Sequence, residues 1–108
     1  MKIIVVGAGK VGYSLCERLV QDDHDVYLID RSQERIHNLE NTLDVSLVCG
    51  NGSDIQLLNE IDLSDVGMFI SVTDSDEVNI LSCAVAKIAG VPSTEIGRAS
   101  CREECRSR

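Results

Sequence analysis

The sequence predicts an α/β fold in which short parallel strands alternate with helices, and three observations support this prediction. Four short apolar runs, at residues 3–6, 26–29, 45–49 and 67–72, are separated by segments with apolar residues at helical spacing. Such runs are typical of strands buried on both faces. The first run leads directly into a glycine motif, and the second ends at an aspartate. This alternation predicts βαβ units and a parallel sheet.

The first strand and the glycine turn after it are the most informative stretch of the chain. Residues 3–6 read I-I-V-V, and Gly7-x-Gly9-x-x-Gly12 follows at once. Gly7 permits a tight turn, Gly9 lets a pyrophosphate approach the backbone, and Gly12 lets the next helix lie close to the strand. The N–H groups of that helix then face the phosphates. The predicted phosphate-binding loop comprises Gly7, Ala8, Gly9, Lys10, Val11 and Gly12.

The second strand, residues 26–29, ends in a carboxylate suited to bind the ribose of an adenosine. Asp30 follows this strand directly, and Arg31 comes next. A carboxylate here accepts hydrogen bonds from the ribose hydroxyls and repels a 2′-phosphate, which favours NAD(H) over NADP(H). The adjacent guanidinium of Arg31 can nevertheless accommodate such a phosphate. The structural alternative for Asp30 is a turn residue or a helix cap.

Four helices are expected between and after the strands. The first spans about residues 10–22, Ser32 is suited to cap the second, and Ser53-x-x-Gln56 forms a capping box for the third. Asp74-x-x-Glu77 fits a capping box for the fourth. The residues expected to face the core are Val11, Leu15 and Leu19 in the first helix, Ile36, Leu39 and Leu43 in the second, Ile55, Leu58 and Ile61 in the third, and Val78, Leu81, Val85 and Ile88 in the fourth.

Right-handed crossovers between these elements predict a Rossmann-like, doubly wound sheet with strand order 3-2-1-4. Ile96 marks the start of a possible partial fifth strand; without further strands, the fourth strand would be an exposed apolar edge. Ligands bind where the carboxyl ends of the strands flank the switch point between strands one and four. The loops that begin at Gly7, Asp30, Gly50 and Thr73 should therefore converge on one crevice.

Composition excludes some classes of function. The net charge is −8, and residues 1–92 hold six Lys and Arg against fifteen Asp and Glu, which argues against binding nucleic acid. The chain has no apolar run of the roughly 20 residues needed to cross a bilayer, so a cytosolic protein is expected. Cys16, Cys49 and Cys83 lie in apolar patterns and are expected to be reduced core residues. Cys101 and Cys105 form an isolated C-x-x-x-C, which is poor support for a metal site.

Four motifs together identify a family that the sequence resembles. V-V-G-A-G-K-V-G, the strand ending in I-D-R, G-N-G-S, and V-T-D-S-D-E-V-N occur in this order. They resemble the Trk-type potassium uptake regulators, whose nucleotide-binding domain is the RCK (regulator of potassium conductance) N-terminal domain. The resemblance covers about residues 1–92. We expect an incomplete domain over residues 1–97 and a tail outside the domain over residues 98–108.

The resemblance implies a regulatory NAD(H)-binding subunit rather than an enzyme. It implies a cytoplasmic protein at the inner face of the membrane that forms a dimer or ring and controls a potassium-translocating membrane subunit. The residue assignments are Gly7, Gly9 and Gly12 for the pyrophosphate, Asp30 for the ribose, Asn51 and Ser53 beside the adenosine, and Thr73 and Asp74 near the nicotinamide half.

Alternatives remain open at this stage. The glycine loop and Asp30 suit any adenosine diphosphate group, so ATP or ADP could be the ligand. A cofactor-binding fragment of an NAD-dependent dehydrogenase is a further alternative, although neither His24 nor His37 follows a strand as an acid–base group would. Asn51 and Ser53 also fit an ordinary turn with a helix cap. Asp76 and Glu77 suit the start of a helix without any ligand.

Overall fold

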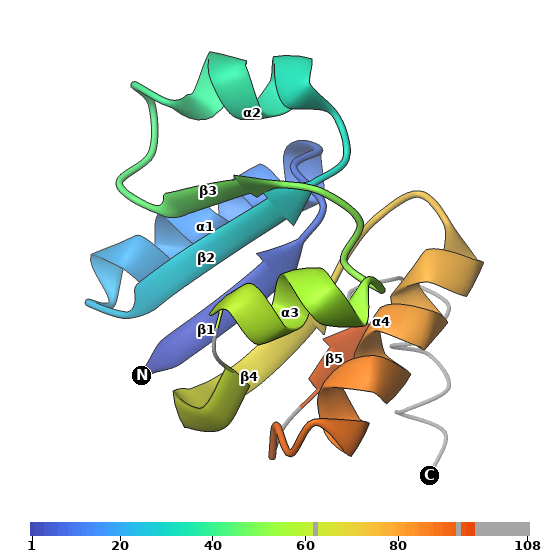
Figure 1. Ribbon diagram of the computed structural model, residues 1–108. Coiled ribbons are helices and arrows are strands. Elements are labelled where there is room, and N and C mark those ends of the chain that lie inside the picture. Colours follow the sequence, from blue (N-terminus) through green and yellow to red (C-terminus); the bar gives the residue numbers. More distant parts are fainter. Residues whose placement is uncertain (62, 93, 97–108) are drawn as a thin grey trace, which may run out of the picture.

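A parallel five-stranded sheet forms the middle layer of the molecule, with helices packed against both faces (Figure 1). This computed structural model describes residues 1–61, 63–92 and 94–96. The strands are β1 (Lys2–Val6), β2 (Asp25–Asp30), β3 (Ser46–Cys49), β4 (Val66–Ser71) and β5 (Thr94–Ile96). The helices are α1 (Lys10–Gln21), α2 (Gln33–Leu39), α3 (Ile55–Ile61) and α4 (Asp76–Ile88), with a short 3-10 turn, η1 (Leu63–Asp65), before β4.

The strand order is β3-β2-β1-β4-β5, and every neighbouring pair is parallel. This order confirms the predicted doubly wound sheet. β5 pairs with β4 from Thr94 onward and so begins before the predicted start at Ile96. The expectation that β4 is an exposed apolar edge is therefore wrong, and Phe69 at its centre is fully buried. The predicted tail, residues 98–108, lies outside the described residues.

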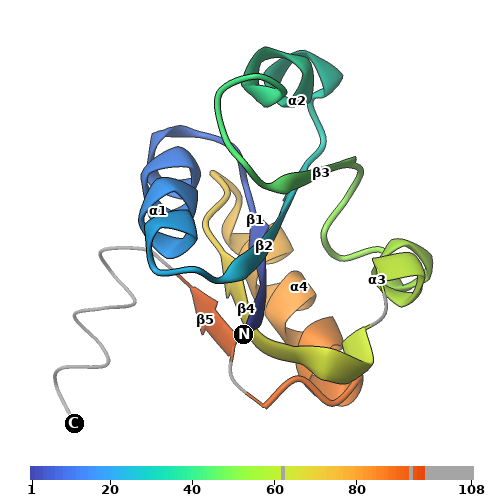
Figure 2. The same ribbon diagram turned by 90° about the vertical axis from the view of Figure 1, so that its left-hand side faces the viewer.

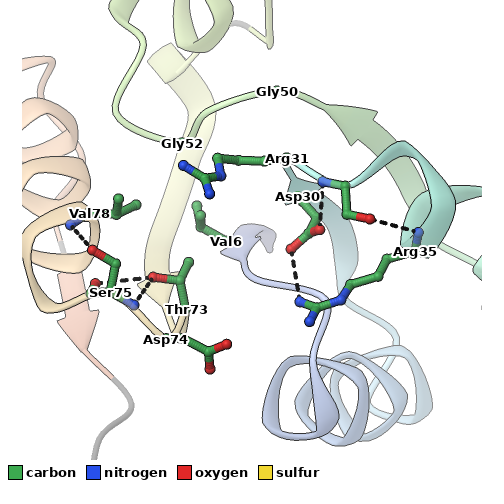
Figure 3. A pocket seen from close by; sticks show the side chains of 11 residues that line it. Val6, Asp30, Arg31, Arg35, Gly50, Gly52, Thr73, Asp74, Ser75 and Val78 are labelled. Carbon is green, nitrogen blue, oxygen red and sulfur yellow. Dashed lines mark hydrogen bonds and ion pairs between the residues drawn. The ribbon is translucent and has the colours of Figure 1, made fainter.

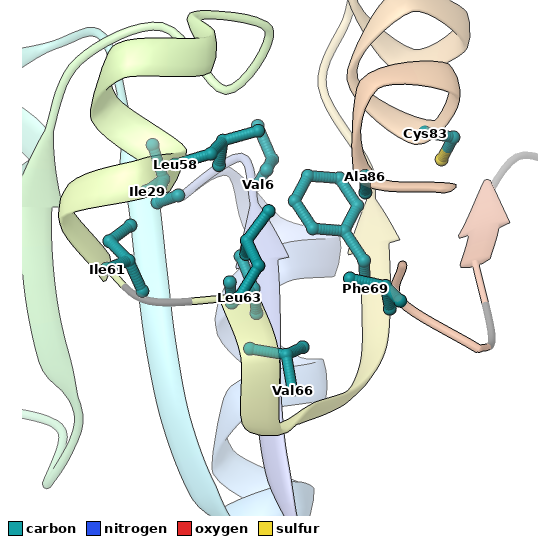
Figure 4. Close-up of a cluster of buried hydrophobic side chains, with 11 residues drawn as sticks. Val6, Ile29, Leu58, Ile61, Leu63, Val66, Phe69, Cys83 and Ala86 are labelled. Carbon is teal, nitrogen blue, oxygen red and sulfur yellow. The ribbon is translucent and has the colours of Figure 1, made fainter. Parts of the chain in front are cut away.

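Two clusters of buried side chains fill the space on either side of the sheet. On one face, α3 and α4 pack over β1, β2 and β4, and Phe69 lies in the middle of this cluster (Figure 4). On the other face, α1 and the leucines at and after the end of α2 cover alternate residues of the same strands. Figure 2 shows α1 on one side of the sheet and α3 and α4 on the other. The β-branched strand residues thus contact a helix layer on both faces, as their uninterrupted apolar runs indicated.

The buried face of α4 differs from the predicted one. Leu81 and Ile88 are 55% and 85% exposed, although both were expected to face the core. The buried residues of the helix are small or polar: Asn79, Ser82, Cys83 and Ala86. Side chains of this size let the helix axis approach β4 and β5 more closely than leucine would. The position of the helix therefore follows side-chain volume, and its most apolar residues remain at the surface.

Among the other predictions for the helices, some are confirmed and some are wrong. Val11 is 57% exposed, whereas Leu15 and Leu19 pack against the core as expected. Ser32 caps α2 as predicted, since its hydroxyl accepts the N–H of Arg35 at 3.2 Å. Asp54 rather than Ser53 is bonded to the start of α3, and Ser75 rather than Asp74 caps α4. The Asp54 carboxylate accepts the N–H of Gln56 at 3.0 Å, and the Ser75 hydroxyl accepts the N–H of Val78 at 3.2 Å.

The cysteines in the described part of the chain have two different environments. Cys16 and Cys83 are buried, as predicted, and burial raises the pKa of the Cys16 thiol to about 12. Cys49 is exposed at the end of β3, where its thiol donates to the carbonyl of Arg31 at 3.6 Å, so its assignment to the core is wrong. Cys101 and Cys105 lie outside the described residues.

Lys2 connects neighbouring elements at the end of the sheet that lies opposite the carboxyl ends of the strands. Its ammonium donates to the carbonyl of Ile61 at 2.9 Å and to the carboxylate of Asp65 at 3.1 Å. The same group lies 4.9 Å from the centre of the Tyr27 ring. These contacts join β1 to β2 and to the connection between α3 and β4.

Replacing Lys2 with methionine should lower the free energy of unfolding by roughly 1–3 kcal/mol, because hydrogen bonds to a charged group are lost. The control is Arg18→Met, since the Arg18–Asp22 pair is exposed and separated by 3.8 Å. An exposed pair of this kind contributes at most about 1 kcal/mol. Urea unfolding of both variants measures the difference. Equal losses would show that the contacts of Lys2 do not stabilise the fold.

Candidate functional site

A cavity of about 450 Å³ opens at the carboxyl ends of β1, β2 and β4. Asp30 and Arg35 lie on one side of it, and Thr73, Asp74 and Ser75 lie on the other (Figure 3). The base of the cavity is formed by Val6, with Gly50 and Gly52 above it after β3. The loops after four different segments therefore meet at one place, as the predicted topology requires.

Asp30 holds two separate backbone segments in place. Its carboxylate accepts the N–H of Ala8 at 3.0 Å through Oδ1 and the N–H of Ser32 at 2.9 Å through Oδ2. The guanidinium of Arg35 lies 3.9 Å from Oδ1, and Asp30 as a whole is only 8% exposed. Each carboxylate oxygen can accept a further hydrogen bond. Asp30 thus has a structural role in the turn, as the alternative suggested, and retains capacity to bind a ligand on its cavity side.

The three glycines differ sharply in the space around them. A side chain at Gly12 would place Cβ 1.7 Å from the carbonyl oxygen of Gly7, and one at Gly7 would lie 3.0 Å from the backbone of Val72. Gly7 also has a φ of 112°, which L-residues with side chains rarely adopt. Nothing lies within 4 Å of a Cβ at Gly9. Gly7 and Gly12 are therefore required by the packing of the protein, whereas the space above Gly9 is open to a ligand.

The amino terminus of α1 is available to an anion. Gly9 is its N-cap and provides no side-chain hydrogen bond, and the first turn contains no acidic residue. The helices α2 and α4, by contrast, are capped by Ser32 and Ser75. Unpaired N–H groups at a helix start, together with the helix dipole, attract phosphate groups. Lys10 and Val11 of the predicted loop are exposed beside them.

Asn51 and Ser53 are bonded to each other outside the cavity. The side-chain oxygen of Asn51 accepts the N–H of Ser53 at 2.9 Å and its hydroxyl at 2.8 Å. Their neighbours Gly50 and Gly52 line the cavity instead, and a Cβ at Gly52 would lie 2.5 Å from the Val6 side chain. The Asn51 turn therefore brings glycine backbone to the cavity, and direct contact of Asn51 or Ser53 with a ligand stays a prediction.

A second cavity, of about 540 Å³, adjoins the first. Both are lined by Thr73, Asp74 and Ser75. The second is also lined by Val11, Val72, Asp76 and Glu77, with no basic residue among its described lining residues. A ligand longer than a nucleoside diphosphate could therefore extend from the first cavity past the Thr73–Ser75 segment into an acidic one. The alternative in which Asp76 and Glu77 serve only the start of α4 is compatible with this position.

Arg35 and Asn79 are among the residues of the site that were missed from the sequence. Arg35 lies beside Asp30 because α2 begins shortly after β2, and its place in the first turn of that helix was the available signal. Asn79 is fully buried beneath Thr73, to which it is hydrogen-bonded. The signal for Asn79 was a polar residue in helical register with Cys83 and Ala86, which apolar periodicity alone does not detect.

Comparison with known proteins assigns the family. The sequence model of the TrkA-N domain matches residues 3–107, nearly the whole chain. The chain belongs to the TrkA-N domain family. This confirms the resemblance to the Trk-type potassium uptake regulators.

Curated relatives of this TrkA-N domain are longer proteins. A Trk system potassium uptake protein TrkA homolog from Methanothermobacter thermautotrophicus is 37% identical over 92 residues, which is 85% of this chain and 43% of that protein. The Trk system potassium uptake protein TrkA of Halomonas elongata is 39% identical over 98 residues, 91% of this chain and 21% of that protein. The chain thus spans less than half the length of these relatives.

Solved structures share the fold of this TrkA-N domain. The GsuK channel bound to NAD superposes with a TM-score of 0.78 at 18% identity, over 97% of this chain and 19% of that one. GsuK bound to ADP gives a TM-score of 0.77 at 18% identity, over 97% of this chain and 28% of that one. At this level of identity the likeness shows the common fold.

Within the described residues, no helix is long and apolar enough to span a membrane, and no group of His, Cys, Asp or Glu is arranged to hold a metal ion.

Replacing Gly12 with alanine should mainly lower the stability of the fold, whereas replacing Gly9 with alanine should mainly weaken nucleotide binding. Gly12→Ala forces a Cβ into the Gly7 carbonyl and should lower the free energy of unfolding by about 1–3 kcal/mol or more. Gly9→Ala should cost at most about 1 kcal/mol, because only the N-cap preference is lost, but it should remove nucleotide binding. Thermal unfolding and calorimetric titration separate the two effects. A Gly9→Ala variant that unfolds, or that binds nucleotide like the parent, contradicts the assignment of Gly9 to the ligand.

Proposed function

We propose that this TrkA-N domain binds NAD(H) at the carboxyl edge of its sheet and thereby regulates a potassium uptake system. The observation that carries the proposal is the bond from the Ala8 amide to the Asp30 carboxylate, at 3.0 Å. It places an acceptor for ribose hydroxyls directly beside an uncapped helix start that suits phosphate. An adenosine diphosphate group needs these two features side by side.

Each part of the dinucleotide has a group suited to it. Asp30 would accept the hydroxyls of the adenosine ribose, and the glycine-lined space at Gly50 and Gly52 would admit the adenine. The N–H groups that follow Gly9 would hold the pyrophosphate. The guanidinium of Arg35, 3.9 Å from the carboxylate, partly compensates the negative charge of Asp30. It does not close the cavity, because the side chain of Arg35 is half exposed. The remaining half of the ligand would extend past Thr73 into the second cavity.

The second cavity favours NAD(H) over ATP. Its acidic residues include Asp74 and Glu77, both exposed, and they would repel a γ-phosphate that projects beyond an ADP group. A nicotinamide ring carries no negative charge and would not be repelled. GsuK structures with NAD and with ADP fit a site in which the adenosine diphosphate half is the shared element.

Regulation rather than catalysis is the role that we infer for the bound nucleotide. The described residues that line the two cavities include no histidine, and His37 lies on the surface of α2, 3.6 Å from Glu40. Hydride-transfer enzymes commonly place an acid–base group, most often a histidine, beside the nicotinamide. The relatives are named as potassium uptake proteins. We therefore propose a cytoplasmic subunit, peripheral to the membrane and oligomeric, that controls a potassium-translocating membrane partner.

Asp30→Asn tests the ribose assignment. The amide keeps one acceptor oxygen but loses the charge, so NAD(H) affinity should fall by roughly 1–3 kcal/mol, the contribution of hydrogen bonds to a charged acceptor. Glu34→Gln is the matched control, because it removes one negative charge from the first turn of α2, and Glu34 is not among the cavity-lining residues. Calorimetric titration of both variants gives the comparison. Unchanged affinity in Asp30→Asn would remove Asp30 from the ligand site.

A further inference from the structure

A buried hydrogen-bond network lies beneath the segment that the two cavities share. Asn79 on α4 is fully buried, and its side-chain oxygen lies 2.8 Å from the Ser71 hydroxyl, 3.0 Å from the Thr73 N–H nitrogen and 2.7 Å from the Thr73 hydroxyl. Its side-chain amide donates to the carbonyl of Thr73 at 3.1 Å. One side chain of α4 thus fixes both the backbone and the hydroxyl of Thr73.

The network holds more donors than its acceptors require. A carbonyl oxygen has two lone pairs, so the Ser71 hydroxyl and the Thr73 N–H are sufficient to satisfy Asn79. The single proton of the Thr73 hydroxyl can reach Asn79 or, at 3.1 Å, the carbonyl of Ser75. That carbonyl already accepts the backbone N–H of Asn79 at 3.0 Å. The Thr73 hydroxyl is therefore the one donor of this network that could turn to a ligand without leaving a buried acceptor unsatisfied.

The position of Thr73 makes this surplus donor relevant to the ligand. Thr73 lines both cavities, and its backbone nitrogen lies 3.1 Å from where a Cβ of Gly7 would be. The Thr73 hydroxyl oxygen also accepts the N–H of Ser75 at 3.2 Å, which limits its rotation. Thr73 lies across the first cavity from Asp30, on the side shared with the second cavity. A ligand that extends from the first cavity into the second therefore passes this hydroxyl, whereas an adenosine held at Asp30 occupies the opposite side.

We propose that Asn79 is a positioning residue that presents the Thr73 hydroxyl as a hydrogen-bond donor to the half of the dinucleotide beyond its adenosine. This inference rests on the proposed NAD(H) site and adds to it the residue that distinguishes a full dinucleotide from its adenosine half. The acceptor on the ligand is a phosphate or ribose oxygen. Asn79 acts through Thr73 and does not itself line either cavity among the described residues.

The test compares binding of NAD⁺ and adenosine by the purified protein, three single variants and the double variant that combines Asn79→Leu with Thr73→Val. Asn79→Leu keeps the shape of the side chain and removes its hydrogen bonds, and Thr73→Val removes the hydroxyl. Ser82→Ala is the matched control: Ser82 is as buried as Asn79 on the same helix, but its hydroxyl has no hydrogen-bond partner in the described structure. Circular dichroism establishes that each variant is folded at the temperature of titration.

We expect Asn79→Leu and Thr73→Val each to weaken NAD⁺ binding about tenfold or more while adenosine binding changes little, and Ser82→Ala to change neither. Because Asn79 acts through Thr73, the double variant with Asn79→Leu and Thr73→Val should lose no more NAD⁺ affinity than Thr73→Val alone. Additive losses, or equal losses for adenosine and NAD⁺, overturn the proposal. Absence of binding of either ligand by the parent protein would instead overturn the proposed function.

Asn79→Asp keeps the proposal testable if Asn79→Leu does not fold. A neutral carboxyl group reproduces one acceptor and one donor of the amide, whereas the ionised form places a second acceptor against the carbonyl of Thr73. Protonation increases as pH falls, so NAD⁺ affinity relative to the parent should recover toward acid pH. A ratio that does not change with pH overturns the positioning role.

Discussion

The hydrogen bond between the Ala8 amide and the Asp30 carboxylate is the interaction on which the rest of the site depends. It joins the loop after β1 to the end of β2, and the same carboxylate accepts the N–H of Ser32 at the start of α2. The two bonds of this carboxylate tie the glycine loop and the start of α2 to the end of β2, beside the cavity. A residue often interpreted only as a ribose acceptor is here also the link between two βα turns.

Close backbone packing provides the second constraint. α1 can start beside β1 only because Gly12 has no Cβ to meet the Gly7 carbonyl, and Gly7 in turn lies against the backbone after β4. The loop after β4 is then held from the other side by Asn79. The glycine loop therefore has fixed protein on both sides, and the space above Gly9 is open. Such an arrangement presents backbone N–H groups to a ligand without the need to reorganise the fold.

The sequence was sufficient for the sheet and for the position of the cavity, since strand burial and glycine turns depend on local residue type. It was insufficient for α4, because hydrophobicity favoured Leu81 and Ile88 for a face that is filled by Asn79 and Ser82. There the close approach of helix and strand requires small side chains, and a buried amide is satisfied only by partners on β4 and the loop after it. Arg35 and the Asn51 turn also depend on tertiary placement, which spacing along the chain does not specify.

An amide NMR titration with NAD⁺ reports which backbone groups of the protein the ligand reaches. If NAD⁺ binds at the carboxyl ends of the strands, the signals of Ala8, Gly9 and Thr73 should shift as it is added. The signals of Lys2 and Asp65, at the opposite edge of the sheet, should remain in place. Shifts concentrated at Lys2 and Asp65, or a glycine loop whose signals do not move at saturating NAD⁺, would contradict a nucleotide site at the carboxyl ends of the strands.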